Sequence, residues 1–299
     1  PQLHGGDKGT VITLNEGADL TIREVLVTGG NGSSEASAYG FDYADVGGGI
    51  FCQDANLILQ GTWVTNSTAN RGGAIFAHNC DVRVRGGAVL KSNSASRYGG
   101  AIWYGGGDDD DTLIVRNSTL TENTVGPTTD ATARGGAIFA RNGKLDIDDS
   151  DFTDNEASKG TGANAALGGA VMADTADVTC NSTTDTGFSG NKVNGNTSVG
   201  TAIVLKGAGS LTSVGCTFNN SGDDIAGVAE CVKGGSSCVG KDLWDEISPE
   251  PSTEMVVDTL VVGYNATGDI SCVVDEFKHY ILSGTGGSTN DWTVETYKC

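Results

Sequence analysis

Apolar and polar residues alternate in short runs along most of this chain. A period of two predicts β-strands with one buried face. The repeating units show no helical periodicity, so the pattern predicts an all-β fold. The clearest runs carry Leu57 and Leu59, Val82 and Val84, Leu113 and Val115, and Leu145 and Ile147.

Two short motifs recur on either side of these runs, at intervals of 25 to 36 residues. Repeats of this length indicate an array of stacked units. The first motif is Gly-Gly-Ala-Ile or a close variant, beginning at Gly47, Gly72, Gly99, Gly135, Gly168 and Gly200. The second is an aromatic or aliphatic residue followed three positions later by asparagine, as in Trp63–Asn66, Leu90–Asn93, Leu120–Asn123, Phe152–Asn155 and Phe188–Asn191, whereas Phe218–Ser221 lacks the final asparagine.

Three short strands in each repeat predict one coil of a parallel β-helix. Glycine suits a corner where the backbone needs positive φ or leaves no room for a side chain, and the isoleucine after it is expected to point inward. The aromatic or aliphatic residue of the second motif, Trp63 included, is expected to stack on its equivalents inside. Its asparagine, Asn66 included, is expected at a turn, where stacked side chains can bond one another along the axis. With a degenerate first coil at Leu20, Ile22 and Val27, about seven coils are expected.

The alternating GGA(I/V) and FxxN tetrapeptides resemble the polymorphic outer membrane protein repeats of bacterial surface adhesins. More broadly, they resemble the right-handed β-helix superfamily that includes the pectate lyases. The resemblance covers about residues 10–224 and implies a right-handed parallel β-helix. It says little about activity, because fold alone does not carry function. The chain differs from such adhesins in lacking an outer-membrane β-barrel segment and in having many cysteines and glycosylation sequons.

The motifs divide the chain into three parts. Residues 1–46 form an N-terminal entry with the degenerate first coil, and residues 47–224 contain the six motif-bearing coils. Residues 225–299 lose the motifs and gain four cysteines. We expect them to form a small β domain, a cap or assembly module, with strands at Met255–Val262, Ile270–Val274 and His279–Leu282.

The formal net charge of −20 argues against nucleic acid and anionic membranes as partners. No apolar run approaches the roughly 18 residues of a membrane-spanning helix. The chain begins at Pro1 without a signal peptide, so we expect a mature or trimmed product.

Eight cysteines favour an oxidising, extracellular compartment. None forms a C-x-x-C pair, which argues against a zinc cluster. Sequence separation suggests two pairs in the C-terminal part, Cys231 with Cys238 and Cys272 with Cys299. Cys52 with Cys80 and Cys180 with Cys216 could link neighbouring coils.

Seven N-x-S/T sequons also point to a secretory route. Covalent N-glycans are therefore expected, and the chain needs no other cofactor apart from a possible structural calcium ion. Asn66 and Asn219 are expected to be poorer acceptors, because the ladder position would turn Asn66 inward. The preferred acceptors lie in turns or insertions: Asn31, Asn117, Asn181, Asn196 and Asn265.

A search for catalytic groups finds little. The histidines His4, His78 and His279 lie far apart in the sequence, and a surface or turn position is expected for each. Asp146 and Asp148 flank the inward Ile147, so they share an outer face that could take up calcium. The alternative is a solvated acidic face on which Arg83, Arg85 and Arg116 of nearby coils pair with the carboxylates. A second acidic run, at residues 108–111, lies in a glycine-rich insertion.

Three functions remain. The leading hypothesis is a non-enzymatic, extracellular structural glycoprotein that self-associates head to tail into a surface fibril or matrix. The exposed strand edges of the terminal coils motivate it, because unpaired edges invite pairing with another chain. The first alternative is a monomeric adhesin or carbohydrate-binding β-helix, and the second is a calcium-dependent polysaccharide lyase.

Overall fold

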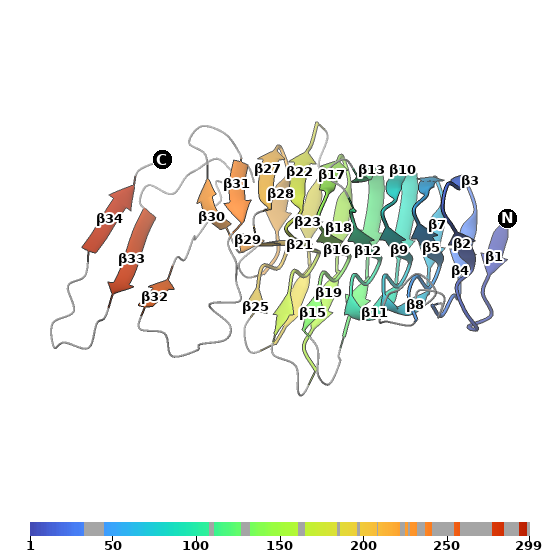
Figure 1. The fold of residues 1–299 in the computed structure, drawn as a ribbon, viewed down its shortest axis with the longest axis horizontal. Helices are drawn as coiled ribbons and strands as arrows, with labels where there is room; N and C mark the ends of the chain where they lie inside the picture. The colour runs from blue at the N-terminus through green and yellow to red at the C-terminus, as the bar shows by residue number, and fades with distance from the viewer. Residues whose placement is uncertain are drawn as a thin grey trace.

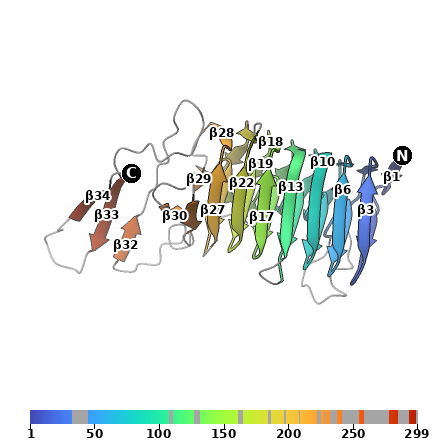
Figure 2. The ribbon, with the colours of Figure 1, turned by 90° about the horizontal axis from the view of Figure 1, so that it is seen from above.

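The computed structural model describes residues 1–32, 45–107, 111–126, 132–160, 165–183, 186–195, 198–207, 209–221 and 225–226, together with the backbone of five strands beyond them. All regular structure in these residues is β-strand. The strands form four sheets, and three of these run side by side along the length of the stack (Figures 1 and 2).

Sheet B contains the strands of the six Gly-Gly-Ala-Ile motifs and their variants, with β2 and β29 at its two ends. All its strand pairs are parallel, and each strand lies beside its equivalent from the next repeat. Its eight strands are β2 (Ile12–Leu14), β5 (Ile50–Gln53), β9 (Ile75–His78), β12 (Ile102–Gly105), β16 (Ile138–Arg141), β21 (Val171–Asp174), β26 (Ile203–Lys206) and β29 (Ile225–Ala226).

Sheet A contains the alternating runs and the strands of the second motif. Two of its strands, β10 and β13, span both segments without a break. Its fifteen strands are β1 (Gln2–His4), β3 (Asp19–Arg23), β4 (Leu26–Thr28), β6 (Asn56–Gln60), β7 (Trp63–Thr65), β10 (Asp81–Lys91), β13 (Thr112–Thr121), β17 (Lys144–Asp148), β18 (Asp151–Thr153), β22 (Asp177–Asn181), β23 (Gly187–Ser189), β27 (Ser210–Val214), β28 (Thr217–Asn219), β30 (Val228–Cys231) and β31 (Ser237–Gly240).

Sheet C is formed between the asparagine of one repeat and the Gly-Gly of the next. Its eight strands are β8 (Thr68–Arg71), β11 (Ser94–Tyr98), β14 (Thr124–Val125), β15 (Ala133–Arg134), β19 (Glu156–Ser158), β20 (Ala166–Leu167), β24 (Lys192–Asn194) and β25 (Ser198–Val199). The small antiparallel sheet D consists of β32 (Glu254–Val257), β33 (Phe277–Ser283) and β34 (Thr293–Tyr297).

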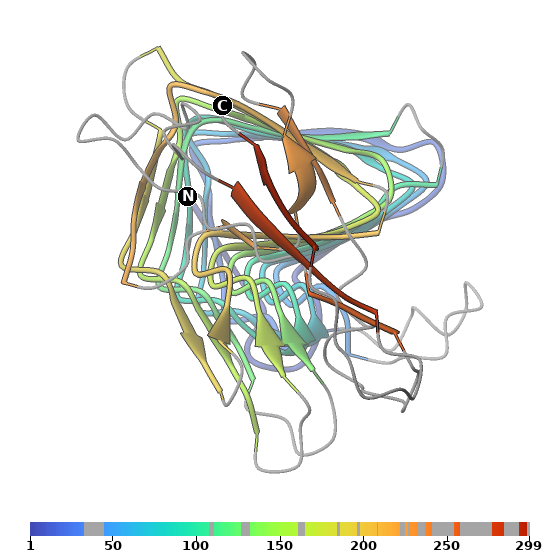
Figure 3. The ribbon, with the colours of Figure 1, turned by 90° about the vertical axis from the view of Figure 1, so that its left-hand side faces the viewer.

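The chain visits the three large sheets in a fixed order. It runs from β9 in sheet B through β10 in sheet A and β11 in sheet C, and then returns to sheet B as β12, directly beside β9. Viewed along the stack, successive circuits nest behind one another (Figure 3). We call one such circuit a coil. This arrangement has the character of a parallel β-helix or β-solenoid.

A Gly-Gly pair at a corner of sheet B has two separate steric reasons, which Gly99 and Gly100 illustrate. Gly99 has φ of 62°, in the left-handed region that glycine adopts at little cost. A Cβ atom on Gly100 would lie 2.1 Å from the carbonyl oxygen of Gly136 in the next coil. One glycine turns the chain, and the other lets adjacent coils approach.

The interior is filled by the residues that the alternating pattern predicted to point inward. The isoleucine of the first motif is fully buried in the main core with the inward residues of sheet A, as predicted. Phenylalanine rings of the second motif also stack there, with centroids 4.8 Å apart for Phe152 and Phe188 and 5.0 Å apart for Phe188 and Phe218.

Sheet B is buried on both faces, which the alternation did not predict. The residue after each motif isoleucine points away from the main core into a second apolar cluster, which also includes Leu167 of sheet C. Phe51, Phe76 and Trp103 stack along this outer face, with centroid distances of 5.5 and 4.3 Å. The recurrence of a large apolar residue directly after Ile was the available signal for a second buried face.

A ladder of asparagine side chains runs along the stack, as predicted, and all but the last of them are buried. In each step the backbone N–H and the Nδ2 of one asparagine donate to the Oδ1 of the next, at 2.7–3.1 Å. The ladder residues are Asn93, Asn123, Asn155, Asn191 and Asn220. The final repeat therefore keeps an asparagine in the ladder, although it comes one residue earlier than in the other motifs.

The predicted alignment of the Trp63–Asn66 motif is wrong by one residue. Val64 of β7, not Trp63, lies opposite Leu90 of β10 and is fully buried. The ladder position of this coil is consequently Ser67, whose N–H donates to the first ladder asparagine at 3.1 Å. Trp63 is 50% exposed, and Asn66 is an exposed residue with φ of 50° at the preceding turn.

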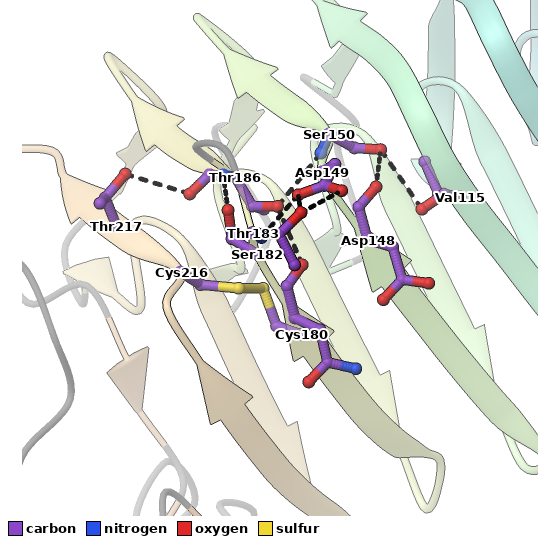
Figure 4. Close-up of a disulfide and its surroundings, with 11 residues drawn as sticks. Val115, Asp148, Asp149, Ser150, Cys180, Ser182, Thr183, Thr186, Cys216 and Thr217 are labelled. Atoms are coloured by element: carbon purple, nitrogen blue, oxygen red, sulfur yellow. Dashed lines mark hydrogen bonds between the residues drawn. A yellow bond between two sulfur atoms is a disulfide. The ribbon is translucent and has the colours of Figure 1, made fainter.

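Two disulfides join neighbouring coils, and they are the two pairs predicted to form such links. Cys52 bonds to Cys80, with a Cα–Cα distance of 6.4 Å, and Cys180 bonds to Cys216, with 6.3 Å. All four residues are buried. Figure 4 shows the second bond among the hydroxyl side chains of adjacent coils. These bonds indicate an oxidising environment.

At the C-terminal end of sheet A, the strand pairing changes from parallel to antiparallel. Strand β27 pairs with β31 in the antiparallel sense, and β31 continues to β30. In sheet D, β32 and β33 partly overlap the strands expected at residues 255–262 and 279–282. Strand β34 was not expected from the sequence. The expected strand at residues 270–274 lies outside the described residues.

Candidate functional site

The two calcium candidates, Asp146 and Asp148, share the outer face of β17, as the alternation required. On the neighbouring strand β13, Arg116 lies directly opposite Asp148. Its Nε donates to Oδ2 of Asp148 at 2.9 Å, and its terminal nitrogen contacts the same oxygen. Asp148 is thus an ion-pair partner of Arg116 in this structure.

The environment of Asp146 disfavours its charged form. Partial burial raises the pKa of this carboxyl above its ordinary value, and the neighbouring Asp148 charge raises it further. Within the described residues, no group of three or more His, Cys, Asp or Glu side chains could hold a metal ion. The acidic run at residues 108–110 lies outside these residues, although Asp111 is described and accepts a hydrogen bond from the Gly107 N–H at 2.7 Å.

His4 and His78 make different contacts in the structure. His4 accepts a hydrogen bond from the Gly6 N–H at Nδ1, at 2.8 Å. His78 stacks near Trp103, with ring centroids 6.2 Å apart, and burial lowers its pKa. His279 lies in β33, of which only the backbone is described.

A charged cluster that the sequence did not reveal connects sheet C to sheet B. The guanidinium groups of Arg71 and Arg134 lie 5.2 and 5.3 Å from the centroid of the Tyr98 ring. Arg134 also reaches Asp174 of β21 at 3.9 Å, and Asp174 contacts Lys206 at 3.5 Å. The cation–π contacts join strands within sheet C, and the largely buried ion pair of Arg134 with Asp174 joins sheet C to sheet B. The sequence alone does not show that these residues lie in adjacent coils, because that depends on the register in which the strands pair.

Five of the seven sequon asparagines can be placed. All five are exposed: Asn31, Asn66, Asn117, Asn181 and Asn219. The prediction that the Asn66 side chain points inward is therefore wrong. Asn196 and Asn265 lie outside the described residues.

Only some of the predicted disulfide cysteines of the C-terminal part can be described. Cys231 of β30 and Cys238 of β31 are directly opposite each other in an antiparallel pair. The register places their backbones at neighbouring positions. Cys272 and Cys299 lie outside the described residues.

The N-terminal end of the stack presents open strand edges. Strands β1, β2 and β3 each pair with a single strand among the described ones, β4, β5 and β6 respectively. Every residue of β1 is exposed, and Leu3 is 44% exposed. Five apolar residues of the first coil are only partly buried where they pack on the main core: Val11, Ile12, Ala18, Leu20 and Val25.

The described residues contain no helix with the length and apolarity needed to cross a membrane. Neither a known protein-family model, nor a curated protein, nor a solved structure matches this chain.

Proposed function

We propose that this chain is an extracellular, non-enzymatic structural glycoprotein that joins other copies through its N-terminal end. In this proposal it is a right-handed parallel β-helix of about seven coils and the subunit of a surface fibril or matrix. The right-handed sense is supported by the resemblance of the repeats and by the rule that parallel crossover connections are almost always right-handed.

The open N-terminal end carries the proposal. An unpaired edge offers a row of free N–H and C=O groups to another strand, and natural proteins usually blunt such edges with charged residues. Strand β3 has exposed charges at Asp19 and Arg23, but β1 and β2 contain no acidic residue, lysine or arginine. The first coil therefore offers both hydrogen-bonding groups and apolar surface to a partner.

The partner surface in this proposal is the C-terminal part of another copy. The two ends of the stack differ, since β27 is covered by the antiparallel β31 whereas β1, β2 and β3 have no outer neighbour among the described strands. A contact between unlike ends does not close on itself and generates a fibre. The net charge of −20 opposes association, so added salt should promote it by screening the repulsion.

Microscopy and light scattering test this function directly. The full oxidised chain should form filaments that grow with protein concentration and ionic strength. Leu3→Lys should block them, because lysine on an edge strand disfavours edge-to-edge pairing. Trp63→Lys is the matched control, since Trp63 is similarly exposed, at 50%, but lies on β7, which is paired on both sides with β4 and β10.

Monodisperse wild-type particles under all of these conditions would contradict the filament. That result would favour the alternative of a monomeric adhesin.

A further inference from the structure

The one-residue shift of the Trp63–Asn66 motif leaves a sequon asparagine exposed three residues after an exposed aromatic side chain. Trp63, Asn66 and Thr68 belong to the segment Trp-Val-Thr-Asn-Ser-Thr. Asn66 meets the requirement of a hydroxyl residue two positions later. We propose that Asn66 carries an N-linked glycan whose first sugar packs against the indole of Trp63. This inference rests on the extracellular location in the proposed function.

Asn66 has the position and conformation of an attachment site. It follows β7 directly, is exposed, and has φ of 50°, so its side chain leaves the stack at a turn. Its Nδ2 contacts the Thr65 hydroxyl at 3.4 Å. One amide hydrogen is replaced on glycosylation, and the second can keep this long contact.

Trp63 supplies an apolar platform on the same strand. It lies on the outer face of β7, in register with Leu26 on one side and Val89 on the other. The large exposed hydrophobic side chains of the described residues are Leu3, Trp63 and Val214, and only Trp63 is aromatic. An exposed indole of this size is costly to hydrate, and covering its face with the C–H face of a sugar ring removes that apolar area from water.

The spacing brings the sugar within reach of the ring. Trp63 precedes Asn66 by three residues, which is about 10 Å along an extended strand. Between them, Val64 points into the core and Thr65 is 7% exposed, with its hydroxyl 3.2 Å from that of Thr28. The surface from Asn66 to Trp63 is therefore short and bordered by a small side chain.

The covalent step is a group transfer from a lipid-linked donor. The Asn66 Nδ2 attacks the anomeric carbon of an oligosaccharide carried on a lipid diphosphate. The C–N bond forms as the C–O bond to the diphosphate breaks. The displaced Nδ2 proton passes to a base of the transferase, and the lipid diphosphate leaves. In the folded chain Thr68 Oγ1 donates to Asn31 Oδ1 at 2.7 Å, so this hydroxyl is available to the transferase when that surface hydrogen bond opens.

The other described sequons lack the platform. The residue three positions before Asn117 is Ile114, and the corresponding residue before Asn181 is the buried Val178. Asn31 and Asn219 have Thr28 and Cys216 at this position. Glycans at those sites serve as internal controls for contact with an aromatic ring.

Glycopeptide mapping tests attachment. The full chain, secreted from a eukaryotic host, is treated with an amidase that converts glycosylated asparagine to aspartate in heavy-oxygen water. The label is expected at Asn66, and its loss together with one glycan mass is expected in Asn66→Gln. If Asn117 is labelled and Asn66 is not, the inference is overturned. The fibre proposal is not affected by that result, because microscopy tests it separately.

Proton NMR of the glycan tests the packing. The protons of the first sugar at Asn66 should be shifted upfield by the indole ring current. The shift should disappear in Trp63→Ala, persist in reduced form in Trp63→Tyr, and be absent from the glycan at Asn117. Identical sugar shifts in wild type and Trp63→Ala overturn the contact. The Tyr variant retains an aromatic ring and thus keeps the test valid if the Ala variant folds poorly.

Discussion

The asparagine ladder makes a quantitative prediction about Asn123, which lies in the middle of the stack and is fully buried. Its Oδ1 accepts from the backbone N–H and the Nδ2 of Asn93, both at 3.1 Å. Its Nδ2 donates to the Leu90 carbonyl at 2.9 Å and to the Asn155 Oδ1 at 3.0 Å. Asn123→Ala removes all four hydrogen bonds.

The expected loss of stability depends on which polar groups stay buried without a hydrogen-bond partner. The Asn93 N–H loses its partner inside the stack, which costs about 1–3 kcal/mol, and the other three hydrogen bonds contribute about 1 kcal/mol each. We therefore expect Asn123→Ala to lower the free energy of unfolding by about 4–6 kcal/mol. This is a large part of the total stability of a typical domain.

Urea denaturation of the unglycosylated protein measures this loss, and hydrogen exchange at the Asn93 amide locates it. Asn219→Ala is the matched control, because Asn219 is exposed on β28 and should change stability by less than about 0.5 kcal/mol. A loss for Asn123→Ala no greater than that of the control, with the Asn93 amide still protected, would refute the argument.

Three further predictions concern the acidic face, the first disulfide and the corner glycines. Because the folded-state pKa of Asp146 is raised, its carboxylate destabilises the fold above that pKa and not below the unfolded value. Asp146→Asn should therefore raise the urea midpoint at about pH 7 and leave it unchanged at about pH 3; an equal effect at both pH values would contradict this. Replacing Cys52 and Cys80 together by alanine should lower stability by about 4 kcal/mol, from the loop entropy of a 28-residue separation, in the same denaturation assay. Gly100→Ala should lower stability by about 1–3 kcal/mol or prevent folding, measured by thermal melting, because its Cβ would lie 2.1 Å from the Gly136 oxygen.

The parts of the fold that sequence could predict are those in which one residue type satisfies one steric or hydrogen-bonding need. Glycine at Gly99 is identifiable because a corner with positive φ favours it. The asparagine ladder is identifiable because it repeats beside an inward aromatic or aliphatic residue. The second apolar cluster was missed because Phe76 and Trp103 alternate with inward residues, so their side of the strand resembled a solvent-facing one. Among the described residues, Leu167 of sheet C and Val46 and Ala165 outside the strands pack in this cluster, and such contacts are not encoded within any single strand.

The placement of Asn66 shows why a site can depend on register more than on composition. Trp63 and Val64 are both apolar, and both Asn66 and Ser67 can bond backbone groups at a turn. The segment alone therefore fits two alignments. A one-residue shift moves side chains from one face of a strand to the other, so the pairing of Val64 with Leu90 buries the smaller residue and leaves Trp63 outside. The same shift makes Asn66 an exposed residue three positions after the exposed Trp63, and not the interior ladder member that was predicted. The neighbouring strand β10 thus decides whether this sequon is available for modification.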